Sequence, residues 1–102
     1  MDLTFIKKEL GTDPKMLKEL TTIFKRNISE YLNIMEMALD VGDYEKIYFA
    51  SHKVTPSCQM FGLEEQTIQL ARIEALAKDN NNISEISVLH KEVEKRFKSI
   101  LQ

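Results

Sequence analysis

One histidine lies where a helix could present a reactive side chain to a partner. His52 stands inside the stretch FASHKVTPSCQMFG (residues 49–62), and Pro56 follows it by four residues. Histidine acts in proteins as a general base, a nucleophile or a metal ligand. The second histidine, His90, is remote in sequence and the chain has a single cysteine, so no Cys/His cluster is available for a metal ion. The chemistry left to His52 is that of a lone imidazole.

The helical repeat places His52 opposite the apolar side of its segment. At about 100° per residue, six small or apolar residues fall in an arc from about 140° to 240° away from the histidine. These expected core residues are Ile47, Ala50, Val54, Ser57, Cys58 and Phe61. The imidazole is therefore predicted to face solvent, and the thiol of Cys58 is predicted to be buried as a small apolar group.

Large apolar side chains share the histidine's side of the helix. Tyr48, Phe49, Pro56 and Met60 all fall on this face, which would be polar if it met only water. An apolar patch around a reactive polar group is typical of a docking site. A simpler interpretation stays open, in which Phe49 and Met60 only widen the contact with the core.

Pro56 is unusual inside a segment that otherwise has a helical pattern. A proline there removes the amide that would bond the carbonyl of His52, at a cost of about 3 kcal/mol. One interpretation is that the missing amide and the compact ring clear space beside the imidazole for a partner. The other is a plain kink, or a helix that restarts after Pro56.

Five helical segments are expected to position this face. Pro14 follows a candidate N-cap, Thr12 or Asp13, and Asn82 precedes Glu85 by three residues, as in a capping box. The breaks between the helical patterns fall near Gly11, Gly42, Gly62 and the tract DNNN at residues 79–82. The expected helices cover residues 3–10, 14–41, 44–61, 63–79 and 83–100.

The connections between these segments are short, and no segment alternates with a period of two. Short connections favour antiparallel neighbours, so the predicted fold is all-α, an up-down four-helix bundle with a short extra N-terminal helix. The inward residues expected in the fourth segment are Leu63, Leu70, Ala71 and Leu76. The apolar stripe expected in the last segment is Ile83, Ile86, Leu89, Val93, Phe97 and Ile100. His90 lies beside this stripe and is expected to be a boundary residue without a function.

Composition is ordinary for a soluble protein. The 102 residues are 43% hydrophobic and 29% charged with a formal net charge of −2, which predicts one domain over residues 1–102 and argues against a nucleic-acid binder. One cysteine gives no intramolecular disulfide, and no run of about 20 apolar residues could span a bilayer. The opening MDLTFIKKEL is unlike a signal peptide. We expect a cytoplasmic monomer without membrane or nucleic-acid contacts.

The segment SHKVTPSCQMFGL resembles the active segment of histidine-containing phosphotransfer (HPt) domains. That segment has a histidine, two residues, a lysine, then a small residue or proline, and a glycine ten residues after the histidine. His52, Pro56, Gly62 and Leu63 fall in register with this pattern. The lead-in GDYEKIYFASH and the five-helix plan are also similar to the family, so the resemblance covers nearly the whole chain.

The resemblance implies a phosphocarrier of two-component phosphorelay signalling, without autokinase activity. His52 would accept a phosphoryl group from the aspartyl phosphate of a response-regulator receiver domain and pass it to another receiver, and a hybrid sensor histidine kinase is a further candidate partner. A neutral imidazole can attack an acyl phosphate in line. The Mg²⁺ would belong to the receiver, so this chain would need no cofactor of its own.

One position departs from the family pattern. The lysine that HPt domains carry three residues after the histidine is replaced by Thr55, which has a hydroxyl but no charge. The candidate phosphate neighbours are therefore Lys53, Thr55 and Gln59. The candidate docking residues remain Tyr48, Phe49, Pro56 and Met60.

Three alternatives compete with a phosphocarrier. The dimerisation helix of a sensor histidine kinase also has a proline soon after its histidine, but an acidic residue follows that histidine directly, and here the position holds Lys53. No glycine-rich ATP-binding segment follows either. A degenerate HPt-like domain that docks partners without chemistry stays open because of Thr55. So does an unrelated helical adaptor.

Overall fold

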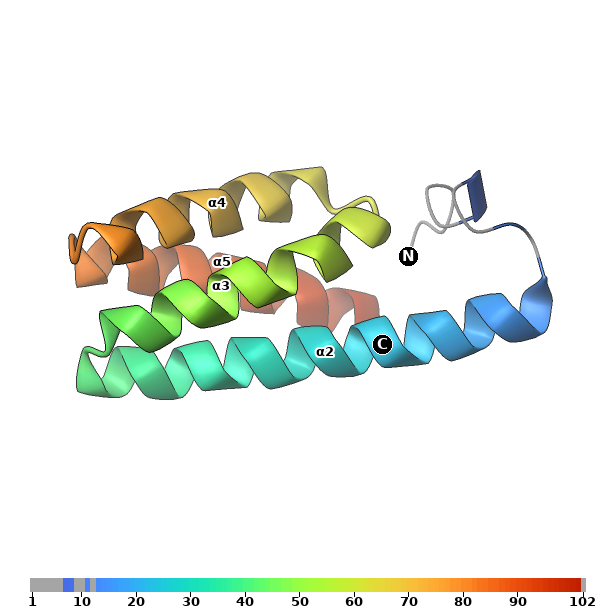
Figure 1. The fold of residues 1–102 in the computed structure, drawn as a ribbon, viewed down its shortest axis with the longest axis horizontal. Helices are drawn as coiled ribbons and strands as arrows, with labels where there is room; N and C mark the ends of the chain where they lie inside the picture. Colours follow the sequence, from blue (N-terminus) through green and yellow to red (C-terminus); the bar gives the residue numbers. More distant parts are fainter. Residues whose placement is uncertain (1–6, 9–10, 12, 102) are drawn as a thin grey trace.

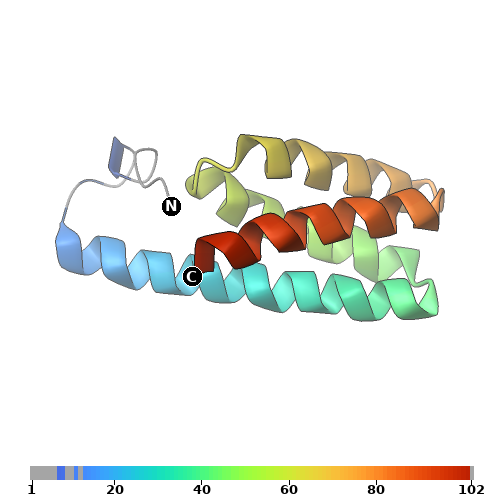
Figure 2. The same cartoon turned by 180° about the vertical axis from the view of Figure 1, so that it is seen from behind.

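The computed structural model describes residues 7–8, 11 and 13–101, and it contains four helices in this part of the chain. They are α2 (Pro14–Val41), α3 (Tyr44–Met60), α4 (Glu64–Lys78) and α5 (Ile83–Leu101). Figures 1 and 2 show them as an elongated up-down bundle in which α2 is the longest member. The predicted all-α bundle is confirmed. The extra helix expected over residues 3–10 falls outside the described residues, except for Lys7 and Lys8.

The turn between α2 and α3 is built from residues suited to helix ends. Gly42 closes α2 with φ 66°, in the left-handed conformation that glycine adopts without strain from a Cβ atom. Asp43 then accepts a hydrogen bond from the amide of Lys46 at 3.1 Å, which caps the start of α3. A chain reversal this short places α3 antiparallel to α2.

A second glycine turn joins α3 to α4. Gly62 has φ 68°, and the amide of Leu63 bonds back to the carbonyl of Cys58 at 3.1 Å.

The last helix begins at the cap that the sequence predicts. The side chain of Asn82 accepts a hydrogen bond from the amide of Glu85 at 3.1 Å, so the N-cap expected for this helix is confirmed. The helices pack as a ring, in which α3 contacts α2 and α4, and α5 contacts α4 and α2.

The core side of α3 is buried as its helical pattern predicts. All six residues of the expected arc are buried: Ile47, Ala50, Val54, Ser57, Cys58 and Phe61. The ring of Phe61 meets Phe24 of α2 edge to face, with centroids 5.9 Å apart. Burial raises the pKa of the Cys58 thiol to about 12, so this cysteine stays protonated and chemically inert at neutral pH.

Two expectations about the other helices are wrong. His90 is not a boundary residue: it is 3% exposed, and its Nε2–H donates to the carbonyl of Leu32 at 3.0 Å. It lies four residues after Ile86 and three before Val93, both buried, and so occupies the centre of the stripe. The hydrogen bond to α2 makes a polar ring tolerable there. Ala71 is exposed, since it lies one step round α4 from the fully buried Leu70.

None of the helices in the described part of the chain combines the length and apolarity needed to cross a membrane.

Candidate functional site

His52 projects from the outer face of α3. Its side chain is 63% exposed, whereas the opposite side of the same helix forms the core. The predicted outward orientation of the imidazole is confirmed. Helix α3 runs unbroken through Pro56 to Met60, so a helix that restarts after the proline is wrong.

Glu74 of α4 holds the imidazole in one orientation. His52 Nδ1 lies 3.1 Å from Glu74 Oε1. An ionised carboxylate can only accept hydrogen bonds, so Nδ1 carries the proton. In the neutral ring the lone pair is then on Nε2. The contact therefore selects the nitrogen that can act as a nucleophile.

Nothing in the α3 pattern alone indicates Glu74. What indicates Glu74 is its sequence distance from the turn between α3 and α4. His52 lies eleven residues before Leu63, and Glu74 lies eleven residues after it. Antiparallel helices that leave a common turn bring such equidistant residues to the same height. A search for charged residues at matching distances from Leu63 would have found this carboxylate.

Aromatic rings lie on the N-terminal side of His52. The ring of Tyr48 is parallel to the imidazole, with an interplanar angle of 4° and centroids 6.2 Å apart. Phe49 is 47% exposed and meets Tyr31 of α2 edge to face at 6.2 Å. The ammonium of Lys53 lies 5.7 Å from the centre of the Phe49 ring, within cation–π range. Of these, Tyr48 is half-buried and packs partly on the core.

The candidate phosphate neighbours differ in how free their polar groups are. The hydroxyl of Thr55 donates to the carbonyl of Ser51 at 2.7 Å, so its proton is already engaged within α3. Gln59 is exposed, and no hydrogen bond involves its side chain among the described residues. Lys53 is exposed as well, although its ammonium makes the cation–π contact with Phe49.

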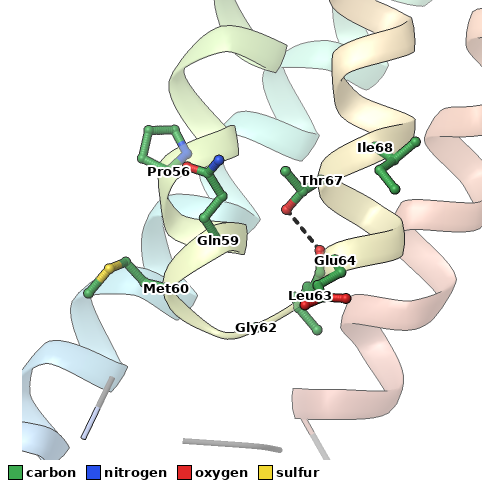
Figure 3. A pocket seen from close by; sticks show the side chains of 8 residues that line it. All are labelled: Pro56, Gln59, Met60, Gly62, Leu63, Glu64, Thr67 and Ile68. Carbon is green, nitrogen blue, oxygen red and sulfur yellow. Dashed lines mark hydrogen bonds between the residues drawn. The ribbon is translucent and has the colours of Figure 1, made fainter. Parts of the chain in front are cut away.

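An apolar groove continues this surface toward the α3–α4 turn. It has a volume of about 680 Å³ and is lined by Pro56, Gln59, Met60, Gly62, Leu63, Glu64, Thr67 and Ile68 (Figure 3). Met60 is half-buried and Pro56 is exposed, so two of the expected docking residues border this groove. The other two, Tyr48 and Phe49, lie beyond His52 toward the start of α3. The pattern of α3 missed Ile68, which is 71% exposed on α4.

Within the described ranges, no three His, Cys, Asp or Glu side chains lie close enough to share a metal ion. The surface thus brings together one oriented imidazole, a carboxylate, aromatic rings and an apolar groove. This arrangement suits a nucleophile that meets a protein partner.

Comparison with protein families places this geometry in a known group. The family model of the Hpt domain matches residues 19–102. The chain belongs to the HPt family. His52, Glu74 and the groove all lie inside the matched region, which spans most of α2 and all of α3, α4 and α5. No curated protein and no solved structure gave a match.

Membership in the HPt family makes this chain a histidine phosphocarrier of phosphorelay signalling. HPt domains interact with receiver domains and with histidine kinases.

Proposed function

We propose that His52 accepts a phosphoryl group from the aspartyl phosphate of one receiver domain and passes it to a second receiver. The observation that carries the proposal is the hydrogen bond from the exposed imidazole to Glu74. In the neutral ring this bond puts the proton on Nδ1 and the lone pair on Nε2, and the side chain is 63% exposed, so a receiver can approach it.

The transfer step follows from this arrangement. The Nε2 lone pair forms the new N–P bond while the P–O bond of the acyl phosphate breaks, and the bonding electrons return to the receiver's aspartate as a carboxylate. Positive charge that develops on the ring is balanced by Glu74 through the Nδ1 proton. Transfer to the second receiver runs the same step in reverse. The receiver supplies Mg²⁺ to neutralise the phosphoryl oxygens, so this chain needs none of its own.

The partner would contact apolar surface on both sides of the imidazole. Tyr48 and Phe49 lie on one side, and Pro56, Met60 and Ile68 border the groove on the other. Lys53, Thr55 and Gln59 remain the candidate phosphate neighbours within α3. A second function, docking of receivers without transfer, is favoured by the hydroxyl of Thr55, since its proton is donated to Ser51.

The deciding experiment is phosphoryl transfer from several receivers charged with a labelled small phosphodonor in Mg²⁺. We expect an acid-labile, alkali-stable label on this chain, and loss of that label when a second receiver is added. ATP alone is expected to give no label, because no glycine-rich ATP-binding motif follows His52 in the sequence. Binding without label would support the docking function instead, and neither binding nor label would refute both.

Replacing Glu74 with glutamine tests the role of the carboxylate. The amide of the Glu74→Gln variant could still accept a hydrogen bond but could not balance charge on the ring, so we expect the transfer rate from a receiver to fall about tenfold. Glu45→Gln is the matched control, because it removes the same charge from the same surface without a bond to His52. The rate of phosphoryl transfer is measured by rapid quench, and the affinity for the receiver is measured alongside it. Equal rates in the two variants would contradict the role given to Glu74.

A further inference from the structure

The phosphoryl group would enter a surface that already holds two carboxylates. Glu74 lies 3.1 Å from the imidazole, and Glu45 stands two turns before His52 on the same face of α3. A phosphoryl group adds roughly −1.5 to −2 charges near neutral pH. A phosphorylated His52, as proposed above, therefore needs a cation within reach.

The nearby cations are not equally available. The ammonium of Lys53 is held over the ring of Phe49. The guanidinium of Arg72 on α4 donates to Glu85 of α5 at 2.7 Å, and this pairing raises the pKa of Arg72. Lys78 is exposed, and it takes part in none of the ion pairs found among the described residues.

The packing of α3 against α4 places Lys78 beside the site. Lys78 follows Glu74 by four residues, so the two share one face of α4 and lie about one turn apart. Because α3 and α4 are antiparallel (Figure 1), that turn lies level with Tyr48, one turn before His52. A surface cavity of about 440 Å³ confirms the placement, since Tyr48 and Lys78 both line it, together with Glu45, Ala77 and Asn80.

We infer that Lys78 supplies the positive charge that stabilises the phosphoryl group on His52. Along the helix axis Lys78 is offset from the level of His52 by about one turn, roughly 5.4 Å, and the flexible four-carbon stem of a lysine can extend back over that turn toward the imidazole. The ring of Tyr48, parallel to the imidazole, offers a surface along which that stem can lie while the ammonium reaches Nε2. Lys78 is then a phosphate-positioning residue contributed by the neighbouring helix.

Lys78 also has an ordinary role, because it stands in the last turn of α4, where a cation interacts favourably with the helix dipole. That role affects the stability of the helix but has no effect on a phosphoryl group at His52. The test must therefore observe the phosphoryl group itself.

The experiment is a ³¹P NMR titration of the full chain after His52 has been phosphorylated chemically with phosphoramidate, which requires no receiver. Loss of one unit charge about 6 Å away in water should raise the pKa of the phosphoryl group by roughly half a pH unit. We expect this rise in Lys78→Gln and not in Lys78→Arg. Lys95→Gln is the matched control, since it removes the same charge from the exposed side of α5, a helix that packs mainly on α4 and α2.

Three results would overturn the inference. They are an unchanged pKa of the phosphoryl group in Lys78→Gln, an equal change of that pKa in Lys95→Gln, or a change confined to Lys53→Gln. The result is separable from the proposed function. A chain that phosphoramidate labels at His52 but that no receiver phosphorylates would refute the transfer function while the titration still decides the role of Lys78. Failure of phosphoramidate to label His52 would overturn both.

Discussion

His52→Gln is expected to carry no phosphoryl label from any receiver, while its thermal midpoint stays within about 4 °C of the unaltered protein. Glutamine can still donate a hydrogen bond to Glu74 but has no nucleophilic nitrogen. The side chain is 63% exposed and contributes little to the core, so the change in the free energy of unfolding should be within about 0.5 kcal/mol. Label transfer and thermal unfolding followed by circular dichroism measure the two effects.

The other histidine provides a control with the opposite outcome. His90 is buried and donates to the carbonyl of Leu32, so His90→Gln should keep its label but lose about 1–3 kcal/mol of stability. Label that persists in His52→Gln would show that another residue is the acceptor. A large loss of stability in His52→Gln would show that the imidazole supports the fold.

Phe61→Ala is expected to lower the free energy of unfolding by about 3–5 kcal/mol. The ring of Phe61 is almost fully buried at the end of α3 and packs on Phe24 of α2. Its removal leaves a cavity where α2 and α3 meet, next to the turn that sends the chain into α4. Since small domains have only about 5–15 kcal/mol in total, this loss should be plain in urea denaturation.

Phe49→Ala is the matched substitution on the exposed face of the same helix. Its ring is 47% exposed and meets Tyr31 and Lys53, so truncation should cost below about 1 kcal/mol of stability. It should instead weaken receiver binding, which titration calorimetry can measure. Similar stability losses in Phe61→Ala and Phe49→Ala would contradict the division of α3 into a core side and a docking side.

The sequence was sufficient for the features of α3 that follow from the helical repeat. The apolar arc of α3 is predictable because each helical residue advances by about 100°, so spacing alone separates Val54 and Phe61 from His52. Turn residues were equally informative, since Gly42 and Gly62 adopt the positive φ that ends a helix.

Features that depend on how two helices lie against each other were missed. Glu74, Lys78 and Ile68 belong to the site only because α4 packs beside α3, and a helical wheel of one segment carries no such information. The prediction for His90 was wrong for another reason: it placed this residue beside the apolar stripe, although the spacing from Ile86 and Val93 puts it on the buried face. The hydrogen bond that allows its burial is accepted by Leu32 of α2, which lies 58 residues earlier in the sequence.

The two-sided character of α3 has an evolutionary consequence. The residues that hold the bundle together and those that would meet a partner are nearly separate sets, and Met60, half-buried at the groove, is among the few shared by both. Substitutions on the outer face can therefore accumulate without unfolding the domain. A duplicated copy of this gene could acquire new receivers through a handful of surface changes, and so insulate one signalling pathway from another while the scaffold stays the same.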